Sequence, residues 1–152
     1  MKALLEHLYF LAQYLSETDL ETITAIILID VGFPVGRTSF DYLVTAILRY
    51  KSNPEQLITW ELYPDIGKLY GRKTRMQVEI TMRREIRKQW NKRNLDKWNL
   101  YFPDGITTRE KGPANSEFIF GMAKVLRIWE GCCENYRKKV GEADEQNAKH
   151  EP

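Results

Sequence analysis

The sequence predicts an all-α domain of six or seven helices that includes a helix-turn-helix. Three observations support this fold class. Apolar residues recur at three- and four-residue steps along most of the chain, which is the spacing of an amphipathic helix. Clusters of Gly, Pro and Asn separate these periodic segments. Alternation of apolar and polar residues, the pattern of a half-buried strand, is weak throughout, and there is no internal repeat.

The first two helices are expected at residues 2–15 and 19–31. The first has a regular apolar stripe, formed by Leu4, Leu5, Leu8, Leu11, Ala12 and Leu15. Thr18 is a suitable N-cap for the second, because Glu21 follows three residues later and completes a capping box. The second segment is rich in Ile, so a buried strand is the competing interpretation there. Residues 32–36, with two Gly and one Pro, end this segment.

Two further helical segments follow before the basic part of the chain. Thr38 or Ser39 can cap the third helix. The Asn-Pro pair at residues 53–54 ends it and places a Pro at the first position of the next segment, where Pro is tolerated. Pro64 lies inside that fourth segment and must kink it or divide it in two. Gly71 then ends the segment as a C-cap.

The second half of the chain holds two more predicted helices. Thr74 caps one that runs to about residue 93, and its inner stripe recurs every four residues: Val78, Met82, Ile86 and Trp90. Residues 99–114 are expected to be a loop, because they include two Gly and two Pro. Asn115 or Ser116 caps a last helix. The predicted organisation is therefore an N-terminal amphipathic helix at 1–17, a domain at 18–140 and a disordered polar tail at 141–152.

The composition excludes several classes of protein. The length of 152 residues suits one compact domain. The longest apolar run, residues 25–29, is far shorter than the about 18 residues that a membrane span needs. Glu6 and His7 interrupt the N-terminal segment and no small-residue cleavage site follows, which argues against a secretory signal. We therefore expect a cytoplasmic protein with no membrane partner.

The basic residues are concentrated in one segment. Residues 71–98 hold ten of the 23 Lys and Arg residues but only three of the 21 Asp and Glu residues. The segments before and after it are mildly acidic, and the net charge of the whole chain is only +2. A patch of this kind attracts a polyanion such as nucleic acid, although a solvated helix face has the same composition.

Residues 62–93 have the layout of a helix-turn-helix: a short helix, a tight turn with Gly71, and a longer basic helix. Gly67 suits the first helix, because the two helices must approach closely. A recognition helix reads bases mainly with its N-terminal turns. The expected base-reading residues are Gln77, Glu79, Ile80, Arg83 and Arg84. Arg can bond to guanine, Gln to adenine and Glu to cytosine, whereas Ile can only touch a thymine methyl.

A second group of basic residues lies toward the ends of this helix and on its outer face. These residues suit phosphates, which position a protein on the duplex without specifying the sequence. They are Arg72, Lys73, Arg75, Arg87, Lys88, Lys92 and Arg93. The predicted partner is therefore double-stranded DNA. The alternative is a protein-interaction module that keeps the fold without reading DNA, since Ile80 on a polar face also suits a protein partner.

Four segments of the chain resemble the C-terminal DNA-binding effector domain of stage zero sporulation protein A, the transcription factor that starts sporulation in Firmicutes. The resemblance covers about residues 23–129. The segments are Val31-Gly32-Phe33-Pro34 with Phe40-Asp41-Tyr42-Leu43; Leu62-Tyr63-Pro64-Asp65-Ile66-Gly67-Lys68-Leu69-Tyr70; Val78-Glu79 with Met82-Arg83, Ile86 and Trp90; and Pro113-Ala114-Asn115-Ser116-Glu117-Phe118-Ile119.

The resemblance implies a six-helix regulator that binds short operator boxes, often in tandem, and contacts RNA polymerase. It also implies a homodimer on tandem sites and a location at the nucleoid. Glu79 and Arg83 match residues that contact DNA in the family, whereas Ile80 stands where the family has Arg and the turn is one residue longer. Only about 20 residues precede the match, so no receiver domain is expected. The helix at 2–15 either caps the core, which we favour, or serves dimerisation.

Catalytic chemistry has little support in the sequence. The chain has two histidines, His7 and His150, and two adjacent cysteines, Cys132 and Cys133, which do not form a zinc site at a recognised spacing. Both cysteines are expected to be ordinary thiols near the end of the last helix. Neither a phosphate-binding Gly-rich loop nor a nucleophile elbow is found. We expect no enzyme, no metal and no cofactor.

Overall fold

The computed structural model describes residues 1–150 and, for His150, the backbone alone. Seven α-helices and one π-helical turn make up this part of the chain, and it contains no strand. The predicted all-α class is therefore confirmed, and residues 20–31 form a helix rather than the alternative strand. In order, the helices are α1 (Lys2–Leu15), α2 (Leu20–Val31), α3 (Thr38–Ser52), α4 (Tyr63–Leu69), α5 (Arg75–Asn91), α6 (Leu95–Tyr101) and α7 (Asn115–His150).

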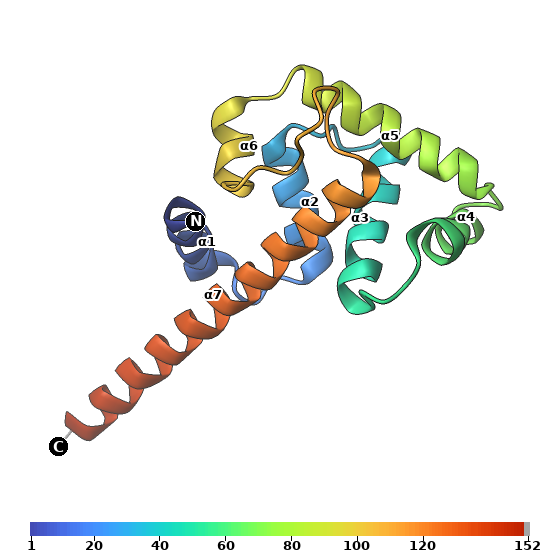
Figure 1. Ribbon diagram of the computed structural model, residues 1–152. Coiled ribbons are helices and arrows are strands. Elements are labelled where there is room, and N and C mark those ends of the chain that lie inside the picture. The colour runs from blue at the N-terminus through green and yellow to red at the C-terminus, as the bar shows by residue number, and fades with distance from the viewer. Residues whose placement is uncertain (151–152) are drawn as a thin grey trace.

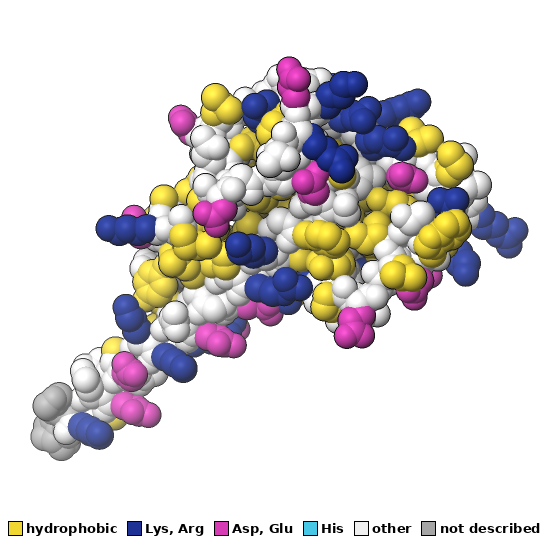
Figure 2. Space-filling model, in the orientation of Figure 1, with side chains coloured by type: hydrophobic (Ala, Val, Ile, Leu, Met, Phe, Trp, Pro, Cys, Tyr) yellow, Lys and Arg dark blue, Asp and Glu magenta, His cyan; other side chains and the backbone are white. Residues whose placement is uncertain are grey.

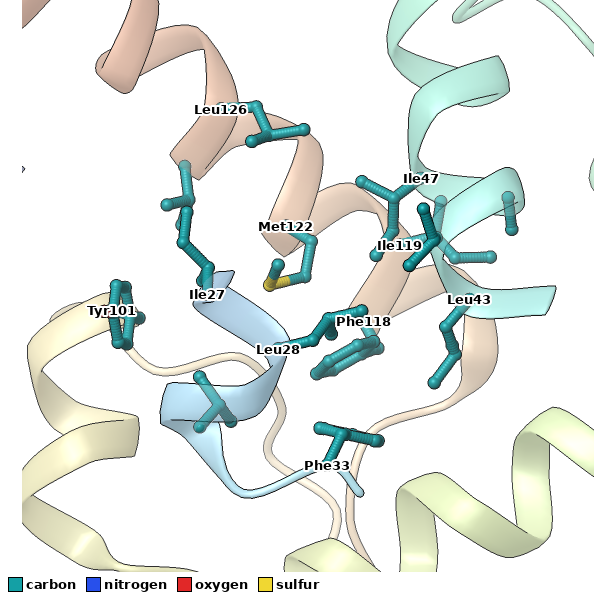
Figure 3. Close-up of a cluster of buried hydrophobic side chains, with 14 of the residues drawn as sticks. Ile27, Leu28, Phe33, Leu43, Ile47, Tyr101, Phe118, Ile119, Met122 and Leu126 are labelled. Atoms are coloured by element: carbon teal, nitrogen blue, oxygen red, sulfur yellow. The ribbon is translucent and has the colours of Figure 1, made fainter. Parts of the chain in front are cut away.

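Helix α7 is the central element, and its N-terminal half runs through the middle of the body (Figure 1). Helices α1, α3 and α5 all contact it. Its apolar side meets α2 and α3 in the main core, where Phe118, Met122 and Leu126 lie against Ile27, Leu28 and Ile47 (Figure 3). Phe33, from the loop after α2, closes one end of this cluster. Large apolar side chains buried together in this way supply most of the folding free energy.

Helix α1 covers one side of α7. Leu4, Leu8 and Ala12 are fully buried, which agrees with the predicted apolar stripe. A short polar chain connects α1 to α2 and α6, because His7 bonds to the hydroxyl of Tyr101, which donates to the carboxylate of Asp30. Helix α1 is thus packed on the core through its apolar stripe.

Two predicted helix caps differ in the structure. The N-cap of α2 is Asp19 rather than Thr18, because the Asp19 carboxylate accepts the backbone N–H of Thr22 at 2.7 Å. This hydrogen bond lowers the pKa of Asp19, and a negative charge at this end of a helix is also favoured by the helix dipole. Helix α3 begins at Thr38 with Arg37 as its N-cap, and no side chain bonds to the free N–H groups there.

The segment before α4 was predicted to be helical from Pro54, but the helix starts later. The first turn is a π-helix, Ile58–Leu62, and the Glu61 carboxylate accepts the backbone N–H of its N-cap residue, Leu57, at 3.0 Å. Pro64 then occupies the first turn of α4, where its missing N–H costs nothing. The sequence predicts a kink or a division at Pro64, and the structure shows a change of helix type beside it: the π-helical turn ends at Leu62 and α4 begins at Tyr63.

The expected loop at 99–114 is wrong in its first part. Helix α6 (Leu95–Tyr101) occupies it, capped by Asn94, whose side chain accepts the N–H of Lys97 at 3.1 Å. This helix has only seven residues, so its periodicity is too short to detect. It persists because two of its side chains are buried: Trp98 packs on Phe33, Trp90 and Phe118, and Tyr101 bonds to His7 of α1 and Asp30 of α2.

The expected disordered tail also differs. Helix α7 continues through residues 141–150, where the side chains up to Lys149 are exposed, and it projects away from the body (Figure 1). Glu, Ala, Gln and Lys propagate a helix that packing has already nucleated. Residues 151–152 of the predicted tail lie outside the described residues. Cys132 and Cys133 are free, buried thiols within α7, well before its end.

Candidate nucleic-acid interface

Helices α4 and α5 form the helix-turn-helix. After α4, Gly71 and Arg72 both adopt left-handed backbone conformations, with φ of +90° and +65°. Two such residues in succession reverse the chain sharply, and Gly is the residue that does so without strain. The N–H of Lys73 then donates to the carbonyl of Gly67 at 2.9 Å and fastens the turn to α4. The predicted turn is therefore present, and Gly71 follows directly after the C-cap Tyr70.

Helix α5 starts with the predicted cap. The N–H of Gln77 donates to the Thr74 hydroxyl at 3.1 Å, and the Gln77 side-chain oxygen accepts the N–H of Thr74 at 2.8 Å. This reciprocal pair is a capping box. It fixes the first turn of α5, and it occupies one acceptor position of the Gln77 oxygen while the side-chain NH₂ stays free to contact a ligand.

The inner face of α5 packs as predicted. Val78, Met82 and Ile86 are fully buried, and Trp90 is half-buried. Two polar residues on the same helix, Glu85 and Gln89, are buried and were not predicted from the sequence.

Glu85 ties α5 to the start of α3. Its carboxylate accepts from the Arg37 guanidinium at 3.4 Å and from the Gln89 amide at 3.4 Å. The orientation of α5 is thus set by one charge-assisted contact as well as by apolar packing. An exposed Arg in the loop before α3 gives no sequence signal of this contact.

The five predicted base-reading residues lie along one side of α5. Gln77 and Arg84 are exposed, and Glu79, Ile80 and Arg83 are partly exposed. Glu79 and Arg83 form an ion pair with 3.7 Å between Oε1 and Nη2. A Glu one turn before an Arg orients the guanidinium. The backbone carbonyl of Glu79 accepts from the amide of Asn115, at the start of α7, so this part of α5 is held in place.

The seven predicted phosphate-contacting residues fall into two groups. Five are exposed: Arg72, Lys73, Arg87, Lys88 and Lys92. The other two stack on tryptophans. The guanidinium of Arg75 lies 4.4 Å from the Trp60 ring, and that of Arg93 lies 3.7 Å from the Trp90 ring. Stacking restrains an Arg side chain and leaves its charge in place, so the cationic character is preserved at both ends of α5.

Lys and Arg side chains gather over α5 (Figure 2). Two hollows border the exposed side of α5 that carries the five predicted base-reading residues, which we call the ridge. One, of about 510 Å³, is lined by Thr38, Tyr42, Lys73, Met76, Gln77, Ile80, Thr81 and Arg84. The other, of about 530 Å³, separates Glu79, Arg83 and Arg87 from the loop that precedes α7. The ridge therefore stands free between two depressions.

The N-terminal segment leaves this ridge uncovered. Helix α1 packs against α7 and α6, on the other side of the molecule from α5 (Figure 1). Such a ridge can enter the major groove of B-DNA, which is about 12 Å wide and accepts an α-helix.

Several residues around the ridge were not predicted. Thr38 and Tyr42 come from α3, Trp60 from the π-helical turn, and Arg109 and Lys111 from the loop before α7. They lie outside α5 in sequence, and no local pattern relates them to that helix, although Tyr42 belongs to a segment that resembles the family. Only the fold brings them to it.

A family model described as sporulation initiation factor Spo0A C terminal matches residues 23–126. The match includes α3, α4, α5 and α6 in full, and with them every residue of the ridge. Among the described residues, no helix has the length and apolar character to cross a bilayer.

Proposed function

Because the chain belongs to the family of the C-terminal domain of sporulation initiation factor Spo0A, a family of DNA-binding transcription factor domains, we propose that it reads specific sequences in double-stranded DNA and regulates transcription. The observation that carries this proposal is the free, cationic ridge of α5 between two hollows. Helix α5 enters the major groove, and α4 supports it from behind.

Within the ridge, Arg83 and Arg84 are the strongest candidates for base reading. A guanidinium can make two hydrogen bonds to guanine, and each such pair contributes about 1–3 kcal/mol of discrimination. Glu79 holds Arg83 in position. Gln77 contributes a donor through its side-chain NH₂, because its oxygen belongs to the cap. Ile80, partly exposed on the same side, meets a thymine methyl.

The cations around these residues contact phosphates. Arg72, Lys73, Arg87, Lys88 and Lys92 are exposed and available for this role, and Arg75 and Arg93 supply further charge from their stacked positions. The proposal extends to contact with RNA polymerase, to pairing of two copies on tandem boxes and to a location at the nucleoid, as the resemblance to the family suggests.

Selection of bound sequences from a random duplex pool tests the proposal directly. We expect enrichment of a short motif by the wild-type protein. Binding to that motif should weaken steeply with salt, with a log–log slope of about −0.9 for each phosphate neutralised. The double variant Arg84→Ala/Lys88→Ala should lose most of the enrichment, whereas Lys138→Ala, an exposed position of α7 beside Tyr9 of α1, should keep it.

A second candidate is a protein-interaction module of the same fold. Ile80 and the exposed Met76 line the same hollow and provide an apolar surface beside the cations. A gel shift with random duplex at low salt separates the two candidates. Absence of a shift at micromolar protein, together with no enriched motif, would favour the interaction module and contradict DNA reading.

A further inference from the structure

The loop before α7 is held firmly against α5. The indole N–H of Trp90 donates to the carbonyl of Glu110 at 3.1 Å. Gly112 packs directly on the Trp90 ring, where an added Cβ would lie 2.7 Å from a ring carbon. Gly112 also has a φ of +107°, a conformation that favours Gly. This contact therefore fixes the loop beside the C-terminal half of α5.

Hydrogen bonds within the loop hold its shape. The N–H of Arg109 donates to the Thr107 hydroxyl at 3.0 Å, and the N–H of Gly112 donates to the carbonyl of Arg109 at 3.2 Å. Glu117, in the first turn of α7, accepts from Thr107 and forms an ion pair with Nε of Arg109 at 3.5 Å. The contact with Glu117 therefore restrains the Arg109 guanidinium through Nε. The other N–H groups of the guanidinium remain available to a further acceptor.

Basic residues occupy both walls of the groove between this loop and α5. Arg83 and Arg87 stand on the α5 side, and Arg109 and Lys111 on the loop side. Two carboxylates also line the groove, and one of them, Glu79, is already paired with Arg83. Lys111 is exposed and has no ion-pair partner among residues 1–150. The groove therefore carries an excess of positive charge on two separate chain segments.

We propose that the loop of residues 107–113 is a second DNA-contacting element, which binds the phosphodiester backbone beside the major groove through Lys111 and Arg109. When α5 lies in the groove, one strand of the duplex must pass along each side of it. The strand on the Arg83 and Arg87 side runs into the depression that the loop borders. This inference rests on the proposed DNA-binding function and adds a contact that the recognition helix does not supply.

The test compares Lys111→Ala with Lys138→Ala, which removes the same charge from the exposed side of α7 beside α1. Both lysines are exposed, so neither change endangers the fold. On the selected duplex, Lys111→Ala should weaken binding and make the log–log salt slope shallower by about 0.9, the value for one phosphate contact. The preferred sequence should remain the same, because phosphate contacts carry no sequence information. Lys138→Ala should change neither quantity.

Single methylphosphonate substitutions along both strands identify the contacted phosphate. At that phosphate, loss of the negative charge should weaken binding by the wild-type protein but not by Lys111→Ala. Inorganic phosphate, added at constant ionic strength, should leave the difference in DNA affinity between the wild-type protein and Lys111→Ala unchanged. Erasure of that difference would mean that the site takes free phosphate, and it would overturn the inference.

The outcomes separate the inference from the function on which it rests. If the wild-type protein binds its motif and Lys111→Ala binds it with the same affinity and salt slope, the loop contact is wrong and the function stands. If the wild-type protein binds no duplex, the proposed function fails and the loop contact fails with it.

Discussion

Gly67 of α4 lies directly against the backbone of Lys73 in the turn. A Cβ added to Gly67 would be 2.1 Å from the Lys73 carbonyl oxygen and 3.0 Å from its carbonyl carbon. The same two residues are joined by the hydrogen bond from the Lys73 N–H to the Gly67 carbonyl. Backbone therefore packs on backbone at this point, and this contact sets how closely α5 follows α4.

Substitution of Gly67 should consequently be costly. We expect Gly67→Ala to lower the free energy of unfolding by about 1–3 kcal/mol, because neither backbone can move aside without opening the turn. Urea unfolding followed by circular dichroism measures this change. The matched control is Gly131→Ala in α7, where nothing lies within 4 Å of the added Cβ. Ala should stabilise that position by about 0.5–1 kcal/mol. Equal effects at the two sites would contradict the close packing of the turn.

Arg83 and Lys92 should have different effects on DNA binding. Arg83→Ala should cost about 1–3 kcal/mol on the preferred sequence and relax specificity at one position, since a guanidinium placed on a base edge is lost. Lys92→Ala should weaken binding to all sequences alike and reduce the salt slope by about 0.9. Fluorescence anisotropy against the selected motif and its single-base variants distinguishes the two patterns. An equal loss on every sequence for Arg83→Ala would refute its base-reading role.

The ion pair of Arg37 and Glu85 should matter for stability through its buried member. Glu85 is 6% exposed, so removal of Arg37 leaves a buried carboxylate with only the Gln89 amide as a partner. We expect Arg37→Ala to destabilise the fold by about 1–3 kcal/mol, the penalty for an unsatisfied buried polar group. Adding Glu85→Gln should recover part of that loss, because the buried charge is then removed. Thermal unfolding of the two variants provides the comparison, and no recovery in the double variant would count against this explanation.

His7 should make stability depend on pH. Partial burial lowers its pKa, and this effect outweighs the nearby Asp30 carboxylate, which acts in the opposite direction. The folded state therefore favours the neutral imidazole. The contribution of His7 to the free energy of unfolding is complete above its ordinary pKa of 6.5. It is lost as the pH falls below that value toward the lower pKa of the folded state. Urea unfolding should show that the free energy of unfolding declines between about pH 7.5 and pH 5.5, and His7→Gln should make this decline smaller.

Two other groups must be separated from His7 in that experiment. When His150→Gln is introduced into both the wild-type protein and the His7→Gln variant, His7 is the one histidine that differs between the two proteins. For Asp30, partial burial raises the pKa, but the hydrogen bonds from Tyr101 and Lys97 together lower it below its ordinary value of 3.8. Its stabilising contribution is thus lost only in more acidic solution. An identical decline with and without His7 would show that the imidazole does not titrate in this way.

The amino-acid sequence by itself determined the parts that depend on local chemistry. The stripe of Val78, Met82 and Ile86, the Thr74 cap and the Pro64 division all follow from spacing and from the hydrogen-bonding capacity of single residues. The cationic outer face of α5 could be identified in the same way, because a helix with one apolar side must turn its other side outward. The apolar stripe and the segment around Pro64 also carry the resemblance to the family.

Only the tertiary structure decided what surrounds that helix. The seven-residue α6 exists because Trp98 and Tyr101 are buried by helices distant in sequence. The loop carrying Lys111 lies beside α5 because Gly112 packs on Trp90. No local pattern encodes such contacts, since their free energy comes from surfaces that meet only after the chain has folded around α7.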